Sequence, residues 1–289
     1  MNTDNTFGDF EDEFKTYSNS AIALLPVPYD LTSTYHKGAD RGPQAIISAS
    51  TALENFDIET ETEVYRRGIC TLEALEVTEG PEVLFEQVKT SVKALFEDKK
   101  FPVVLGGEHS VTVGAVAAAK ESYPNLSVLQ LDAHADTRET YHGSPYNHAC
   151  VMARVREMCP MVQVGIRSLD GAEWSKLDRE RVYFAHDVAS ASTGAWLTEA
   201  VEQLSQDVWV TIDLDCFDPS IIPSTGTPEP GGLTWYQVTN LLKKTAESKR
   251  IVGFDVVELL PRASNPAPDF VAAKLIYQFL SYIWALNPN

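Results

Sequence analysis

The chain has 289 residues, of which 44% are hydrophobic and 22% are charged, so it can bury a full core and is typical of a globular protein. Its formal net charge of −18 disfavours nucleic acid or an anionic membrane surface as the main partner, although an acidic surface can attract a cationic substrate. No apolar run approaches the roughly 20 residues that a membrane span needs, and no secretory signal is visible. The four cysteines show no CxxC spacing, which is typical of buried thiols in a reducing compartment. We therefore predict a cytoplasmic protein.

The polar, acidic segment through residue 20 is predicted to be an N-terminal arm, and residues 21–289 a single domain. A strand over 21–25 is followed by a turn-rich loop at 38–43 and a helix from Pro43 to about 54. Because later strands, apolar on both faces, alternate with helices, we predict a three-layer α/β/α fold around a parallel sheet. The helices are expected near 82–98, 111–121, 145–158, 195–205, 234–247 and 268–284, and the strands near 102–105, 126–131, 161–165, 181–184, 208–213 and 250–255.

The most informative stretch follows the apolar run 126–131. Asp132, His134 and Asp136 alternate there with two alanines. In an extended backbone, residues two positions apart point to the same side. Three potential metal ligands therefore leave one strand end together, and the small alanines leave room for them.

Two further strands are expected to end in the same kind of side chain. The apolar run 209–213 ends in Asp213 and continues to Asp215, and the run 102–105 is followed by His109. In open α/β sheets, ligands bind beyond the carboxyl ends of the strands. We therefore predict that these side chains meet those of the 132–136 stretch in one metal site.

The composition of this cluster predicts two metal ions. One ion could not use all six ligands comfortably and keep an open position, whereas two ions about 3.5–4 Å apart could share them. Two divalent ions would also neutralise the charges of the four aspartates, which would otherwise repel one another. A shell of oxygens with two imidazoles suits Mn²⁺, although Zn²⁺, Co²⁺ and Fe²⁺ also fit. Any single aspartate could be a turn residue, but four aspartates and two histidines at strand ends favour the metal site.

Four motifs, taken together and in order, resemble the signatures of the ureohydrolases, the family that contains arginase, agmatinase and related guanidino-acid hydrolases. The motifs are Gly-Gly-Glu-His-Ser at 106–110, Asp-Ala-His-Ala-Asp at 132–136, Asp-Leu-Asp-Cys-Phe-Asp-Pro at 213–219 and Gly-Phe-Asp-Val-Val-Glu at 253–258. The resemblance covers nearly the whole chain. It implies an arginase-like fold with a mainly parallel, eight-stranded sheet, a catalytic domain over 21–289, and assembly into homotrimers or homohexamers.

The resemblance also implies roles for individual residues. His148 matches the family's proton shuttle, with His142 as a nearby competitor, and Glu258 matches the glutamate that holds the substrate guanidinium. The ligands of a binuclear manganese centre, with two Mn²⁺ per subunit, would be His109, Asp132, His134, Asp136, Asp213 and Asp215.

The chemistry of a guanidinium fits these roles. Its carbon is a poor electrophile, so the attacking water must be activated, and two divalent ions can lower the pKa of a water towards neutrality. An alkylamine leaves only if it is protonated, and histidine suits that task at neutral pH. A carboxylate such as Glu258 can hold the guanidinium by charge-assisted hydrogen bonds. Asp255 and Glu108 are expected to support the site from behind, and Asp218 to shape a loop.

The loop 137–147 predicts the substrate. It lacks the Asn-Thr-Pro and Ser-Gly-Asn stretches that, in arginases, hold the α-carboxylate of the substrate. We therefore expect agmatine, a small cationic guanidino compound, to be hydrolysed to urea and putrescine in polyamine metabolism, with Glu139 or Glu229 near its ammonium. A guanidino-acid hydrolase such as a guanidinobutyrase is the close rival, with Arg138 holding the carboxylate, and arginase comes third.

Two readings of other kinds remain open at the level of sequence. A two-metal phosphoesterase would suit the ligand spacing, but the motifs lack a basic phosphate clamp near them. A catalytically silent family member that acts as a regulator is expected to have lost a ligand, and none is missing.

Overall fold

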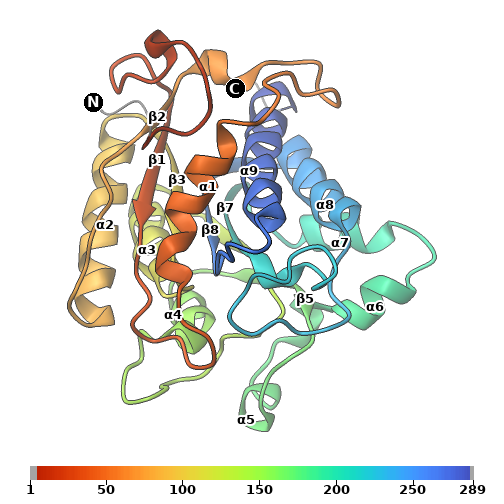
Figure 1. The fold of residues 1–289 in the computed structure, drawn as a ribbon. Helices are drawn as coiled ribbons and strands as arrows, with labels where there is room; N and C mark the ends of the chain where they lie inside the picture. Colours follow the sequence, from red (N-terminus) through yellow and green to blue (C-terminus); the bar gives the residue numbers. More distant parts are fainter. Residues whose placement is uncertain (1–4, 287–289) are drawn as a thin grey trace.

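The computed structural model describes residues 5–286, which contain an eight-stranded sheet with every neighbouring pair of strands parallel. The strand order is β2-β1-β3-β8-β7-β4-β5-β6. This confirms the predicted parallel sheet and three-layer architecture (Figure 1). The strands are β1 (Ile22–Val27), β2 (Ile69–Thr71), β3 (Phe101–Gly106), β4 (Leu126–Leu131), β5 (Met161–Ile166), β6 (Val182–Phe184), β7 (Asp207–Asp213) and β8 (Arg250–Val257).

Helices cover both faces of the sheet. One face packs against α2, α3 and α4, and the other against α1, α7, α8 and α9. The strands are buried along almost their whole length because each face is covered, which explains why they are apolar on both sides. The helices are α1 (Gly42–Ser50), α2 (Pro81–Glu97), α3 (Val111–Ser122), α4 (Val151–Met158), α5 (Gly171–Trp174), α6 (Ala185–Ser190), α7 (Ala195–Glu202), α8 (Trp235–Ser248) and α9 (Ala267–Leu286).

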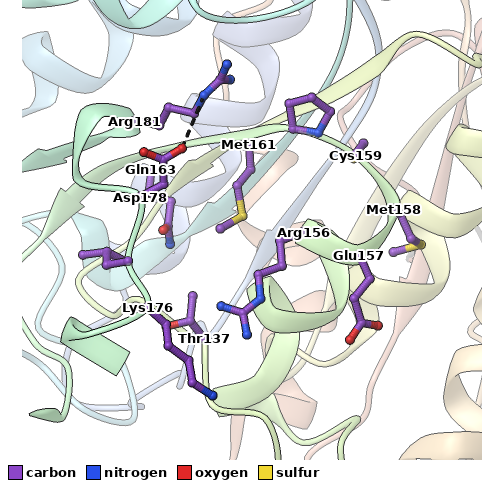
Figure 2. A pocket seen from close by; sticks show the side chains of 12 residues that line it. Thr137, Arg156, Glu157, Met158, Cys159, Met161, Gln163, Lys176, Asp178 and Arg181 are labelled. Carbon is purple, nitrogen blue, oxygen red and sulfur yellow. Dashed lines mark ion pairs between the residues drawn. The ribbon is translucent and has the colours of Figure 1, made fainter. Parts of the chain in front are cut away.

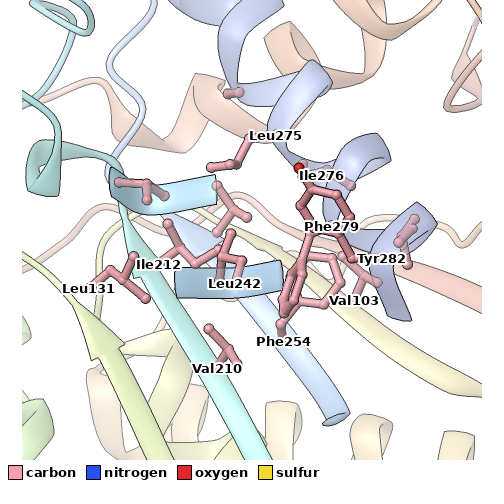
Figure 3. Close-up of a cluster of buried hydrophobic side chains, with 14 of the residues drawn as sticks. Val103, Leu131, Val210, Ile212, Leu242, Phe254, Leu275, Ile276, Phe279 and Tyr282 are labelled. Atoms are coloured by element: carbon pink, nitrogen blue, oxygen red, sulfur yellow. The ribbon is translucent and has the colours of Figure 1, made fainter. Parts of the chain in front are cut away.

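The larger core cluster fills the space between the sheet and helices α8 and α9 (Figure 3). Phe254 of β8 stacks near Phe279 of α9, with ring centroids 4.9 Å apart, and both side chains are fully buried. Leu242 of α8 and Val210 of β7 belong to the same cluster. These buried apolar side chains hold β7 and β8 against α8 and α9.

Some elements differ from their predicted form. Strand β2 and the short helices α5 and α6 were not predicted, and each has six residues or fewer. The helix predicted at 145–158 begins only with a 3₁₀ turn at His148–Cys150, followed by α4. The residues before it form a tight turn, in which Tyr141 and Ser144 exchange backbone hydrogen bonds around Gly143, whose φ is +88°.

The segment predicted to be an N-terminal arm packs on the domain where it is described. Phe7 and Phe10 are buried in the larger core cluster, and the backbone N–H of Gly8 donates to Ser50 Oγ at 2.8 Å. Residues 1–4 lie outside the described part of the chain. Among residues 5–286, no helix is both long and apolar enough to cross a bilayer.

Candidate metal centre

The predicted metal ligands lie at the carboxyl ends of three strands at the middle of the sheet, β3, β7 and β4, and Glu258 follows β8, the strand between β3 and β7. His109 follows β3, and Asp213 is the last residue of β7. At the end of β3, the backbone passes very close to the segment that follows β1. A Cβ on Gly107 would lie 2.0 Å from the backbone carbonyl oxygen of Tyr29, so only glycine fits there. The structure brings all six predicted ligands together at this edge.

One group of ligands surrounds His109, which is buried. Its Nδ1 atom lies 3.1 Å from Asp132 Oδ2, 3.0 Å from Asp136 Oδ2 and 3.5 Å from Asp213 Oδ2. This nitrogen has no hydrogen-bond partner of suitable geometry. A bound cation would stabilise a buried histidine nitrogen and three carboxylates that point at one another.

A second group lies around His134. Its Nδ1 atom is 2.9 Å from Asp215 Oδ2 and 3.6 Å from Asp132 Oδ1. The ligand atoms of His109, Asp132 and Asp213 lie within 4.8 Å of one another, and so do those of Asp132, His134 and Asp215. Because Asp132 belongs to both groups, the residues fit two metal ions that share this carboxylate.

The protein alone leaves these charges poorly compensated. Burial, followed by the charges of Asp215 and Asp132, raises the pKa of Asp213 well above its ordinary value. Burial and the charge of Asp132 raise the pKa of Asp136 to about 6. Burial acts to lower the pKa of His109, but the carboxylates of Asp132 and Asp136 close to it outweigh burial and raise that pKa well above the ordinary value. Divalent cations would supply the missing positive charge.

The other predicted site residues lie around the ligands. Glu258 and His148 both line a cavity of about 30 Å³ beside the ligands. Glu258 has a φ of +65°, a sparsely populated conformation for this residue type, and its Oε1 accepts the backbone N–H of His109 at 2.7 Å. His142 is exposed and stacks on Tyr141 with centroids 4.1 Å apart, outside this cavity. Of the two candidate histidines, only His148 lies at the ligands.

The surroundings of His148 favour its neutral form. Burial, and then the charges of His109 and His134, lower the pKa of His148 to about 4. At neutral pH this imidazole can therefore accept a proton before it passes one on.

A second cavity, of about 230 Å³, adjoins the first and shares His134, Asp136 and His148 with it. Two acidic side chains in it were not predicted, Asp170 and Glu173. The sequence at 170–173 has the pattern of a helix capping box, which the structure contains, and such a pattern indicates a helix start rather than a site.

The predicted polar residues of the substrate loop have other partners. Arg138 Nη1 lies 2.8 Å from Asp170 Oδ2, and its guanidinium lies over the ring of Tyr141. Glu139 pairs with Arg154, Arg156 and Lys176 and lines neither of the two site cavities. Glu229 lines neither cavity either, and its carbonyl oxygen accepts a hydrogen bond from Arg167. Apart from the ligand Asp136, the acidic side chains that line the second cavity are therefore Asp170 and Glu173.

A larger cleft, of about 510 Å³, is not the site (Figure 2). Arg156, Lys176 and Met161 line it, together with Thr137, the residue that follows Asp136. None of the predicted metal ligands lines this cleft. Size alone therefore does not identify the functional cavity, and the converging ligands do.

Sequence reasoning also missed Arg167. Its Nη2 donates to the carbonyl oxygens of Asp215 at 2.7 Å and Glu229 at 2.8 Å. The guanidinium thereby connects the turn that carries a predicted metal ligand to a distant loop.

A profile of the Arginase family matches residues 20–281, so the match spans all of the strand-end motifs that carry the predicted ligands. The chain belongs to the arginase family.

Relatives and solved structures agree with this assignment to the arginase family. An N(1)-aminopropylagmatine ureohydrolase of Synechocystis sp. is 37% identical over 92% of this chain and 90% of the relative. A protein of the same name from Thermus thermophilus is 38% identical over 93% of this chain and 92% of the relative. The crystal structure of agmatine ureohydrolase of Thermoplasma volcanium superposes with a TM-score of 0.87 and 32% identity, covering 95% of this chain and 94% of that one.

Membership of the arginase family confirms the arginase-like fold and the enzyme class. The chain is a ureohydrolase, an enzyme that hydrolyses a C–N bond of a guanidino group. It has His and Asp groups that can hold metal, as this family requires.

Proposed function

We propose that this ureohydrolase is a Mn²⁺-dependent amidinohydrolase of agmatine-type substrates, which are guanidino compounds with a cationic tail and no carboxylate. The observation that carries the proposal is the pairing of Arg138 with Asp170 in the second cavity. This pairing occupies the one cation that could hold a substrate carboxylate there. Glu173 adds another negative charge, so a cationic tail is favoured over an anionic one.

In the proposed reaction, each side chain has a separate task. When bound at His109, Asp132, His134, Asp136, Asp213 and Asp215, two Mn²⁺ ions would make water nucleophilic at neutral pH and polarise the substrate. Glu258 accepts hydrogen bonds from the guanidinium and holds its carbon in place. His148 accepts one proton from the attacking water at Nε2 and donates it to the departing nitrogen, which breaks the C–N bond; the second proton of that water also passes to the amine, so that urea and an alkylammonium ion are released.

Within this substrate class, we propose that N1-aminopropylagmatine is a better substrate than agmatine, the substrate expected from the sequence. Two observations support this order. The relatives from Synechocystis and Thermus carry that substrate in their names, and the second cavity extends the first towards Asp170. An aminopropyl extension adds a second ammonium group, which can reach the acidic groups there. The products would be urea and a triamine, whereas agmatine would give urea and putrescine.

A urea-release assay with added Mn²⁺ tests this proposal on N1-aminopropylagmatine, agmatine, 4-guanidinobutyrate and arginine. We expect kcat/KM for agmatine to exceed that for arginine by at least about a hundredfold, because a buried carboxylate without partners costs several kcal/mol. N1-aminopropylagmatine should exceed agmatine, and Asp170→Asn should reduce that preference. If guanidinobutyrate is the best substrate and Arg138→Ala removes the preference, the enzyme is a guanidino-acid hydrolase instead.

We further propose a homotrimer or homohexamer in the cytoplasm, as the family resemblance implies. The four cysteines are free and buried, which suits a reducing compartment. Light scattering of the purified protein would give a mass of three or six times 31.9 kDa. A monomer would contradict this assembly.

A further inference from the structure

We infer that Thr32 is a positioning residue, whose hydroxyl connects Glu108 to His148 and fixes the imidazole with Nδ1 protonated and Nε2 free for the reaction. This inference rests on the proposed function, because it concerns the proton carrier of that reaction. It adds a residue from the loop after β1, far in sequence from every motif of the site.

The anchor of this arrangement is the carboxylate of Glu108, which is fully buried. The backbone N–H groups of Thr32 and Ser33 donate to Glu108 Oε2 at 2.6 and 3.1 Å. The hydroxyls of Thr32 and Ser110 donate to Glu108 Oε1 at 2.5 and 2.6 Å. Both carboxylate oxygens are therefore satisfied, and the loop at 32–33 is held against the turn that carries His109.

The same threonine hydroxyl contacts His148 twice. The backbone N–H of His148 donates to Thr32 Oγ1 at 3.0 Å, and His148 Nδ1 lies 3.1 Å from the same oxygen. A threonine hydroxyl has one proton to donate and two lone pairs. Its proton is directed to the carboxylate of Glu108, the stronger acceptor, so both lone pairs remain for His148.

The one proton and two lone pairs of the Thr32 hydroxyl determine the tautomer of His148. Since Thr32 Oγ1 has no proton left to give, the contact at 3.1 Å is a hydrogen bond only if Nδ1–H is the donor. Neutral His148 then has its lone pair on Nε2, the nitrogen that must exchange protons with water and the leaving amine. The ring is also held by an edge-to-face contact with Tyr141, with centroids 6.1 Å apart. The hydroxyl of Thr32 thus selects both the tautomer and the orientation.

The test compares Thr32→Val, which keeps the shape of the side chain but removes the hydroxyl, with Thr32→Ser, which keeps the hydroxyl. Both variants retain the backbone donors to Glu108. In the Mn²⁺-loaded enzyme, with agmatine as substrate, we expect Thr32→Val to lower kcat by about 10- to 100-fold with little change in KM. Thr32→Ser should stay close to the wild type. Imidazole added to the assay should partly restore both Thr32→Val and His148→Asn.

The outcomes separate this inference from the proposed function. If His148→Asn retains full turnover, the shuttle of the proposed function is wrong. If His148→Asn is impaired but Thr32→Val is not, the proposed function stands and the positioning role is overturned. Equal losses in Thr32→Val and Thr32→Ser, or a loss of bound metal in Thr32→Val measured by elemental analysis, would also overturn it.

Discussion

A buried chain of hydrogen bonds stands behind His109 on the side away from the carboxylates. His109 Nε2 lies 2.9 Å from Thr211 Oγ1, and Thr211 donates to Asp255 Oδ1 at 2.6 Å. Trp209 Nε1 donates to the other oxygen of Asp255 at 2.6 Å. Since the hydroxyl of Thr211 donates to Asp255, it accepts from Nε2–H of His109, which leaves the lone pair of Nδ1 free for the proposed metal. Asp255 therefore supports the site from behind, as its place at the end of a strand suggested.

We predict that Thr211→Val weakens Mn²⁺ binding by about 10- to 100-fold, because His109 loses the acceptor that selects its tautomer. Thr211→Ser keeps the hydroxyl and serves as the matched control, with an affinity close to the wild type. Competition against a fluorescent chelator measures both. An unchanged affinity in Thr211→Val, with the fold intact by circular dichroism, would show that the hydrogen bond does not tune the ligand.

The positions of the ligands could be predicted from the sequence, but those of their supports could not. Asp132, His134 and Asp136 show their role locally, because a strand alternates its side chains. Thr32 and Arg167 instead act through loops that meet only in the folded chain, and no local pattern marks either of them. Their partners lie 76 residues away for Thr32 and 62 for Arg167.

At the level of elements, the loop between β7 and α8 is fastened by Asp218. Its Oδ1 accepts the backbone N–H of Ser220 at 3.0 Å, and its Oδ2 accepts those of Gly231 and Gly232 at 3.0 and 3.1 Å. Thr227, within the loop, lines both site cavities. Asp218 thus shapes a wall of the site without being a ligand, which is the role that its place before a proline predicted.

We predict that Asp218→Ala lowers the free energy of unfolding by about 2 kcal/mol at pH 7, since three N–H groups lose their acceptor. Hydrogen bonds from Ser220, followed by those from Gly232 and Gly231, lower the pKa of Asp218 to about 2. A lowered carboxyl pKa gives stability that is present above its ordinary value near 4 and is lost as the pH falls through about 2.

The measurement is urea denaturation of wild type and variant across this pH range, followed by tryptophan fluorescence. The difference between the two proteins should be constant from pH 7 to 5 and should shrink below about pH 4. A difference that is the same at pH 3 as at pH 7 would exclude the carboxylate as its source.

Strands were predicted more completely than the turns between them. Six of the eight strands have six to eight residues and show apolar runs, whereas β2 and β6 have three each, and β2 was not predicted. The helix predicted from 145 starts only at His148, because Asn147 caps the 3₁₀ turn: its Oδ1 accepts the backbone N–H of Ala149 at 3.1 Å. This later start is a local effect of the sequence Pro-Tyr-Asn at 145–147.

At the scale of the whole molecule, the parallel sheet concentrates charge at one edge. Strand order places β3, β8, β7 and β4 side by side, so Asp132, Asp136, Asp213 and Asp215 converge although they come from separate parts of the chain. All four are buried, at the end of an apolar core that cannot solvate them. We therefore expect the fold to depend on cations at this edge for part of its stability.

We predict that removing the metal lowers the melting temperature by about 10 °C. Each ion at a hundredfold excess over its dissociation constant adds about 2.7 kcal/mol, and 1 kcal/mol shifts the melting temperature of a domain this large by roughly 2 °C or more. Scanning calorimetry of the Mn²⁺-loaded and chelator-treated protein measures the shift, and adding Mn²⁺ back should restore it together with urea release. Asp132→Asn, which weakens the carboxylate shared by both groups, should melt at nearly the same temperature with and without Mn²⁺. If elemental analysis shows that the metal is gone and the wild type still melts at the same temperature, the carboxylates do not need cations to remain folded.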